Sequence, residues 1–198
     1  MIHKFYPIVP DVDWLKRIVP LGVKTIQLRI KESSNNEIAA QISESLNFCQ
    51  AYSCQLIVND YWEEAIACGC DYIHLGQEDL AASDLERIKS HGLKLGISTH
   101  SHDELDIALA ADPDYVALGP IYETKLKIMK WAPQGLQRLA DWKSKINCPL
   151  VAIGGITVER APGVLDAGAN SIAVVTDFIT HATPEKRIEE WLLAVGDK

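Results

Sequence analysis

The most constraining feature of this sequence is a repeated alternation of short apolar runs with stretches of helical spacing. Eight runs rich in β-forming residues cover positions 5–9, 25–28, 55–58, 72–75, 94–97, 115–118, 150–153 and 171–175. They are apolar nearly throughout, as in parallel strands that are buried on both faces. The stretches between them are amphipathic; residues 36–52, for example, place Ile42, Leu46 and Cys49 on one helical stripe. The pattern predicts an α/β fold with a parallel sheet.

The number of repeats distinguishes between two parallel-sheet folds. Eight strand–helix units in 198 residues leave about 25 residues for each unit, near the minimum for a (β/α)8 barrel. A doubly wound open sheet often carries a glycine-rich turn after its first strand. Here Pro10, Asp11, Val12 and Asp13 follow the first run instead. We therefore expect one TIM-barrel domain over residues 1–198.

Composition and charge exclude several classes of protein. The chain is 47% hydrophobic and 23% charged, which is ordinary for a globular protein, and it has no apolar run of the roughly 18 residues that a membrane span needs. The N-terminus does not read as a signal peptide, so we expect a cytoplasmic protein without a membrane partner. The formal charge is −8 and no basic block stands out, which argues against a nucleic-acid partner. A homo-oligomer is left open.

Barrel chemistry takes place at the carboxyl ends of the strands, and polar residues follow the predicted strands there. Asp60 and Asp79 close two adjacent strands, which are about 4.8 Å apart, so their carboxylates can converge on one ion. Each could instead cap the helix that follows it. Cationic residues on the same rim, Arg29, Lys31 and Lys127, favour a site for Mg²⁺ and a diphosphate.

A second anion site is predicted after the last two strands. Gly154 and Gly155 follow the seventh strand, and Val175 and Thr176 close the eighth. Many barrels bind a phosphate there through backbone N–H groups, although a tight turn without a ligand is the alternative. The 16-residue loop 119–134 has the length of a lid and carries several lysines, unless it is simply a solvated basic loop.

Two histidines lie near the same rim without a clear role. His74 ends an apolar strand, where a core histidine with satisfied hydrogen bonds is the favoured interpretation. His100 is undecided. Neither has a serine or cysteine partner at a recognisable nucleophile turn, so a catalytic triad is not supported.

Several segments, in order along nearly the whole chain, resemble the thiamine-phosphate synthase family. They are QLRIK at 27–31, VNDYW at 58–62, HLGQEDL at 74–80, GISTH at 96–100, ALGPIYETKLK at 117–127, APQGL at 132–136, AIGGI at 152–156 and SIAVV at 171–175. The most specific is HLGQEDL with an Asn-Asp pair upstream. The resemblance implies a transferase that joins hydroxymethylpyrimidine diphosphate to a thiazole phosphate, giving thiamine phosphate and diphosphate.

The resemblance also implies roles for individual residues. Asp60 and Asp79 would hold Mg²⁺, and Arg29, Lys31, Ser98 and Lys127 would take part in catalysis. The pyrimidine diphosphate would be bound by Gln27, Leu28, Arg29, Ile30, Lys31, Asn59, Ser98 and Lys127. The thiazole phosphate would be bound by Thr124, Lys125, Leu126, Gly155, Val175 and Thr176.

One position departs from the family pattern. The family has a second threonine in its T-x-T-K loop, where this chain has Leu126, which cannot donate a side-chain hydrogen bond. Backbone N–H groups or Lys125 could replace that donor. Two other functions are weighed against the synthase: a related thiazole tautomerase, which needs no diphosphate substrate, and a barrel that binds a phosphate ligand without turnover.

Overall fold

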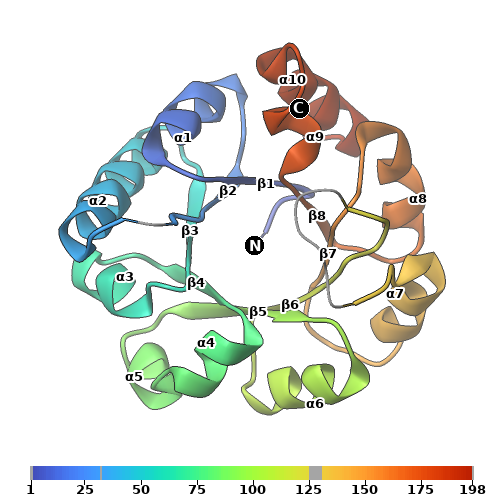
Figure 1. Cartoon of the computed structure of the whole chain (residues 1–198), viewed down its shortest axis with the longest axis horizontal. Coiled ribbons are helices and arrows are strands. Elements are labelled where there is room, and N and C mark those ends of the chain that lie inside the picture. Colours follow the sequence, from blue (N-terminus) through green and yellow to red (C-terminus); the bar gives the residue numbers. More distant parts are fainter. Residues whose placement is uncertain (1, 32, 125–130, 198) are drawn as a thin grey trace.

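The computed structural model describes residues 2–31, 33–124 and 131–197, and these form a closed barrel of eight parallel strands (Figure 1). The strands are β1 (Phe5–Val9), β2 (Thr25–Leu28), β3 (Gln55–Asn59), β4 (Tyr72–Leu75), β5 (Lys94–Thr99), β6 (Tyr115–Leu118), β7 (Leu150–Ile153) and β8 (Ser171–Val174). Each strand pairs with the next, and β8 pairs with β1 through Phe5 and Ile172. The predicted TIM barrel is confirmed.

Helices surround the barrel as an outer ring (Figure 1). In the described residues they are α1 (Val12–Ile18), α2 (Asn35–Ala51), α3 (Trp62–Cys68), α4 (Gln77–Ala82), α5 (Leu85–Ser90), α6 (His102–Ala110), α7 (Gly135–Lys143), α8 (Ala161–Asp166), α9 (Thr176–Ile179) and α10 (Pro184–Val195), with 3₁₀ turns η1 (Val19–Leu21) and η2 (Val158–Arg160). None of these helices has the length and apolar character needed to cross a membrane.

Local sequence signals account for several helix ends. Ser34 and Glu37 form a capping box at the start of α2, which satisfies backbone N–H groups that the first turn leaves free. Pro184 begins α10, where its fixed φ suits the first turn, and Gly196 ends it in the left-handed conformation. Helix α8 ends at Asp166, two residues before the expected Gly168, which adopts a φ of +105° just beyond it.

Buried side chains form two separate layers. The larger cluster fills the space between the strands and the helices and includes Trp142 and Trp191. The smaller one lies inside the barrel and includes Tyr6, Tyr72 and Tyr115. The hydroxyls of Tyr6 and Tyr115 are therefore buried inside the barrel, where they need hydrogen-bond partners within the protein.

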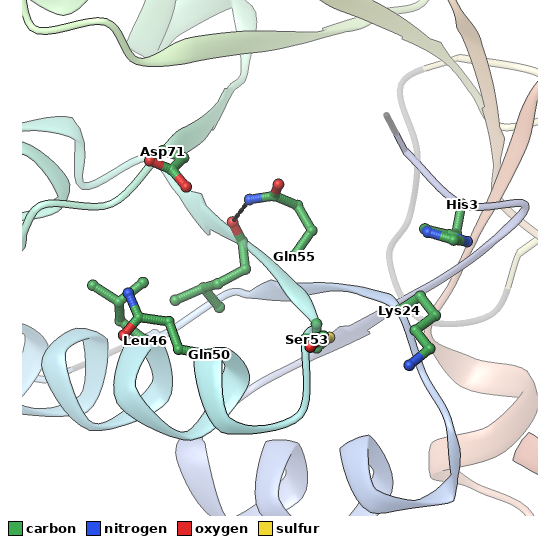
Figure 2. Close-up of a pocket in the computed structure, with 9 residues that line it drawn as sticks. His3, Lys24, Leu46, Gln50, Ser53, Gln55 and Asp71 are labelled. Atoms are coloured by element: carbon green, nitrogen blue, oxygen red, sulfur yellow. Dashed lines mark hydrogen bonds between the residues drawn. The ribbon is translucent and has the colours of Figure 1, made fainter.

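The amino ends of the strands are closed by the start of the chain, which runs to the centre of the ring (Figure 1). The Ser171 hydroxyl donates to the His3 carbonyl at 2.6 Å, and the His3 N–H donates to the Thr25 hydroxyl at 3.0 Å. A hollow of about 370 Å³ opens beside this closure, lined by residues that include Lys24, Gln55 and Asp71 (Figure 2). It lies at the opposite end of the barrel from the predicted site.

Candidate active site

Asp60 and Asp79 come together at the carboxyl ends of β3 and β4. Asp60 follows β3 with a φ of +66°, and its N–H donates to the His74 carbonyl at 3.0 Å. Asp79 lies in the first turn of α4. A Cβ on Gly76 would lie 3.1 Å from Asp79 Oδ2, so the glycine leaves room for this carboxylate. The convergence expected from the sequence is present.

The surroundings of this pair disfavour the ionisation of both carboxyls at once. Burial of the Asp60 carboxyl and the adjacent charge of Asp79 raise the pKa of Asp60 from 3.8 to about 6, against the opposing effects of Arg29 and Asn59. The two carboxyls are close enough to share a hydrogen bond. Two neighbouring carboxylates repel each other when both are ionised, and a divalent cation removes that repulsion.

The helix-capping alternative does not hold for either aspartate. Helix α3 has Tyr61 at its N-cap and α4 has Gly76, and neither N-cap has a side-chain cap hydrogen bond. The described residues bring two carboxylates together here and nowhere gather three or more potential metal ligands. Two hard oxygen ligands fit Mg²⁺, which is commonly held by one or two carboxylates together with waters and phosphate oxygens.

The segment after β2 separates into buried and exposed positions. The side chains of Leu28 and Ile30 are buried in the core between strands and helices, so any ligand contact by them would be through the backbone. Arg29 lies between them, and its charge lowers the pKa of both Asp60 and His74. Its positive charge thus acts on two residues at the carboxyl end of the barrel. Lys31 is exposed.

Three further predicted residues line the same end of the barrel. Gln27 and Asn59 are buried at the ends of β2 and β3, and Asn59 favours the ionised form of Asp60. Ser98, in β5, has its hydroxyl 2.8 Å from His74 Nε2, and its carbonyl accepts from Gln77 Nε2 at 2.7 Å. Gln77, the first residue of α4, therefore holds the backbone at Ser98, a role that the sequence alone did not indicate.

His74 is a buried histidine with both ring nitrogens in hydrogen bonds. Nδ1 lies 2.7 Å from the Tyr115 hydroxyl, and Nε2 contacts Ser98. Burial, with a smaller contribution from the charge of Arg29, lowers the pKa of His74 from 6.5 to about 4. The favoured interpretation of this residue, a core histidine with satisfied hydrogen bonds, is confirmed. Its tyrosine partner was not anticipated.

His100 lies on the rim beyond β5 with a different set of partners. Its backbone N–H and Nδ1 both contact Glu104 Oε2, at 2.7 and 2.8 Å. Its ring stacks on Trp131 with centroids 5.9 Å apart and planes 7° from parallel. The contacts fix the orientation of the ring next to the end of the predicted lid loop.

The glycine turn after β7 packs against the loop after β6. Gly154 and Gly155 have φ values of +97° and +65°. A Cβ on Gly155 would lie 2.3 Å from the Glu123 carbonyl oxygen, so only glycine permits this approach. Arg160 Nη1 donates to the Gly155 carbonyl at 2.5 Å, and its guanidinium lies over the Tyr122 ring. Thr124, half-buried, follows this contact directly.

The other part of the second predicted anion site is at the end of β8. The strand ends at Val174, Val175 is the N-cap of α9, and Thr176 is its first residue. Both are partly exposed, and the N–H groups of a first helical turn have no partner within the helix. Because β7 and β8 are paired neighbours, these residues and the glycine turn occupy adjacent positions on the rim.

Three predicted residues, Lys125, Leu126 and Lys127, lie outside the described residues. Backbone hydrogen bonds join the described residues on either side of them. The Gln134 N–H donates to the Pro120 carbonyl at 2.7 Å, and the Gly135 N–H donates to the Ile121 carbonyl at 3.0 Å. The two ends of the loop are thus joined beside the glycine turn.

This arrangement defines a class: a TIM-barrel enzyme whose polar site lies at the carboxyl ends of the strands. Residues 5–178 match the family model described as thiamine monophosphate synthase. The chain belongs to that family.

Individual relatives agree with this assignment. A thiamine-phosphate synthase from Rhizobium etli is 59% identical over 196 residues, which cover 98% of this chain and 96% of the relative. One from Salmonella choleraesuis is 46% identical over 98% of this chain and 93% of its own length. A solved thiamine phosphate pyrophosphorylase from Pyrococcus furiosus superposes with a TM-score of 0.86 at 27% identity, covering 98% and 96% of the two chains.

Proposed function

We propose that this protein is a Mg²⁺-dependent thiamine-phosphate synthase. It would join hydroxymethylpyrimidine diphosphate to a thiazole phosphate and release diphosphate. The observation that carries the proposal is the Asp60–Asp79 carboxylate pair beside Arg29, in a chain of this family. Such a pair suits a metal–diphosphate complex, and backbone N–H groups of the glycine turn at Gly154 and Gly155 would bind a second phosphate.

The proposed division of labour follows the two sides of the rim. Asp60 and Asp79 would hold Mg²⁺, and Arg29, Lys31 and Lys127 would bind the diphosphate. Gln27, Asn59 and Ser98 would contact the pyrimidine diphosphate, as would the backbone of Leu28 and Ile30. Thr124, Lys125, Leu126, Gly155, Val175 and Thr176 would bind the thiazole phosphate.

The reaction breaks one bond and forms another. The C–O bond between the exocyclic CH₂ and the diphosphate breaks, and its electron pair leaves with the diphosphate. The aminopyrimidine ring stabilises the cation that remains, and the thiazole nitrogen then attacks it to form the C–N bond. Bound Mg²⁺ would supply positive charge to the departing group. The guanidinium of Arg29 and the two lysine ammonium groups would add to that stabilisation.

No general base is needed for this displacement, because the attacking nitrogen has a free electron pair and no proton to lose. This agrees with the site, where buried His74 has a pKa lowered to about 4 and both of its nitrogens are hydrogen-bonded. A cytoplasmic location, which the sequence predicts, would suit a biosynthetic enzyme.

Phosphorus NMR of the purified protein with both substrates and Mg²⁺ tests the proposal. We expect the signals of diphosphate and thiamine phosphate to grow together at equal rates. A sample without the thiazole phosphate is the control for simple hydrolysis. Ligand binding without new phosphorus signals would instead support the phosphate-binding barrel. Conversion of the thiazole phosphate alone, in the absence of the pyrimidine diphosphate, would support the tautomerase.

A further inference from the structure

Five polar side chains form a continuous hydrogen-bonded chain through the interior of the barrel. In order they are Gln27, Tyr6, Tyr115, His74 and Ser98. The distances are 2.6 Å from Gln27 Nε2 to the Tyr6 hydroxyl, 2.9 Å between the two tyrosine hydroxyls, 2.7 Å from Tyr115 to His74 Nδ1, and 2.8 Å from His74 Nε2 to the Ser98 hydroxyl. Both ends of this chain are residues assigned above to the pyrimidine diphosphate.

The centre of the chain is held rigidly by packing. Tyr115 is fully buried, and its ring occupies the space beside Gly96. A Cβ on Gly96 would lie only 2.0 Å from Tyr115 Cζ, so a larger residue would not fit there. The His74 ring stacks on it with centroids 5.5 Å apart. The Tyr6 ring packs edge-on against Tyr115, with centroids 6.2 Å apart. The Tyr115 hydroxyl therefore has one defined position, between Tyr6 and His74.

Each member of the chain has a fixed number of hydrogens. Burial raises the pKa of Tyr6 and Tyr115 far above 10, so both hydroxyls keep their single hydrogen. The His74 ring is buried, its two nitrogens contact the hydroxyls of Tyr115 and Ser98, and no carboxylate among the described residues pairs with it, so the ring is neutral and carries one N–H. A neutral imidazole donates from one nitrogen and accepts at the other.

The direction of the chain follows from the Gln27 end. Because the Gln27 amide N–H donates to Tyr6, the Tyr6 hydrogen is free to point to Tyr115. Tyr115 then donates to His74 Nδ1, which leaves the histidine hydrogen on Nε2. Nε2–H donates to the Ser98 oxygen, and the Ser98 hydrogen remains available for a ligand.

The reverse direction would have a different consequence. With the Gln27 amide turned over, Tyr6 would donate to its carbonyl oxygen and Tyr115 would donate to Tyr6. His74 would then carry its hydrogen on Nδ1, and Ser98 would donate to Nε2. Ser98 would have no hydrogen left for an anionic ligand. The orientation of one amide therefore decides whether Ser98 can act as a donor in the site.

We propose that Tyr115 is a positioning residue, which transmits the hydrogen-bond direction set by the Gln27 amide to His74, so that the Ser98 hydroxyl donates to the pyrimidine diphosphate. Tyr115 does not touch the substrate; it acts through Ser98. The inference rests on the proposed function for the identity of that ligand, whereas the direction of the chain is a property of the protein itself.

A double-mutant cycle tests the coupling. Ser98→Ala should lower kcat/KM for the pyrimidine diphosphate about tenfold or more, the effect of one lost hydrogen bond to a charged group. Tyr115→Phe should lower it about threefold to tenfold and leave the KM of the thiazole phosphate within about twofold. In the double variant, Tyr115→Phe should lower kcat/KM by less than about a further twofold relative to Ser98→Ala alone. The Ser98 hydroxyl, through which Tyr115 acts, is already absent there.

Tyr72→Phe is the matched control. Tyr72 belongs to the same interior cluster, with its ring 6.0 Å from that of Tyr115, and among the described residues its hydroxyl has no hydrogen-bond partner. This variant should keep the kinetics of the unchanged protein. Multiplication of the Tyr115→Phe and Ser98→Ala effects, or an equal effect of Tyr72→Phe, would overturn the proposal.

A spectroscopic measurement tests the direction without any turnover. Nitrogen NMR of the protein with ¹⁵N-labelled histidine reports which ring nitrogen carries the hydrogen, and His74→Gln identifies the signal. We expect His74 to carry its hydrogen on Nε2. The Nδ1–H form would overturn the proposal even in an active enzyme. If the protein made no thiamine phosphate but His74 were in the Nε2–H form, the proposed function would fail while the direction of the chain stood.

Discussion

The two ends of the barrel use polar side chains in different ways. At the amino end, polar side chains bind the backbone at the strand starts: Asp114 Oδ2 accepts from the Leu95 N–H at 2.8 Å, and Asn170 Oδ1 accepts from the Leu150 N–H at 2.9 Å. At the carboxyl end they contact one another, as Asp60 does with Asp79 and His74 with Ser98.

This difference separates the residues that stabilise the fold from the residues that would take part in the reaction. A side chain that satisfies a buried backbone N–H stabilises the native fold, because that N–H would otherwise lack a partner. Two adjacent carboxyls, such as those of Asp60 and Asp79, instead destabilise the native fold, because burial and mutual repulsion disfavour their charged forms until a cation binds. We therefore expect changes at the amino end to alter stability, and changes at the carboxyl end to alter activity.

The largest expected effect is that of removing the metal. EDTA should lower the rate of thiamine phosphate formation at least about 10²-fold, on the order of 3 kcal/mol of transition-state stabilisation, and added Mg²⁺ should restore it. Unfolding by denaturant in EDTA should remain cooperative, since the amino-end contacts do not involve the metal. Full activity in EDTA would contradict the role assigned to Asp60 and Asp79.

The buried His74 in the barrel interior should make the free energy of unfolding of the protein depend on pH. His74 has its pKa lowered from 6.5 to about 4, so below pH 6.5 the unfolded chain binds a proton that the native protein does not. The stabilisation of the native protein that follows from this lowered pKa is fully present above pH 6.5 and is lost as the pH falls towards 4. Between pH 8 and 5 it amounts to about 2 kcal/mol.

Denaturant unfolding of the unchanged protein and of His74→Gln across this range measures the contribution. The difference in unfolding free energy between the two should shrink by that amount as the pH falls. The opposing titration of Asp60 is common to both proteins and cancels in the comparison. A difference that is constant with pH would mean that His74 binds its proton equally in the native and the unfolded states, so that its pKa is not lowered by folding.

A smaller effect is expected at the second anion site. Thr176→Ala should raise the KM of the thiazole phosphate about tenfold, or about 1.4 kcal/mol, with little change in kcat, because a distal phosphate is bound equally before and during the reaction. Thr180→Ala, one turn further along at the end of α9, is the matched control and should leave both constants unchanged. A raised KM for the pyrimidine diphosphate instead would reverse the assignment of the two sites.

The smallest effect is expected at the amino end. Ser171→Ala removes a buried hydroxyl that donates to the His3 carbonyl, and should lower the unfolding free energy by about 1 kcal/mol. Initial rates at 25 °C should not change. Loss of activity in a variant that is still folded would show that the closure of this end affects the site.

Most of the barrel could be predicted from the sequence because strands buried on both faces leave a clear apolar signal. The predictions were least accurate where polar residues extend a strand. β3 continues to Asn59 and β5 to Thr99, since backbone pairing with β4 and β6 does not depend on side-chain polarity. The predicted runs at these two strands end at their last apolar residue, whereas the hydrogen-bonded ladder continues.

The site could be predicted only where residues act close to their own strand ends. Asp60 and Asp79 were found in this way. The chain through Tyr6 and Tyr115 could not be, because these residues are 109 positions apart and meet only across the closed barrel. In the sequence each one reads as an ordinary strand residue, and Gly96, which makes room for Tyr115, reads as an ordinary glycine.

The separation of the two ends is tested most directly by the same substitution at each of them. Asp114→Ala should lower the unfolding free energy by about 1 kcal/mol and leave kcat within about twofold. Asp60→Ala should lower kcat at least about 10²-fold, while its unfolding free energy in EDTA at pH 8 should not fall, because removing one carboxyl relieves its repulsion with Asp79. An active Asp60→Ala, or a loss of activity at Asp114→Ala that matches it, would contradict the account.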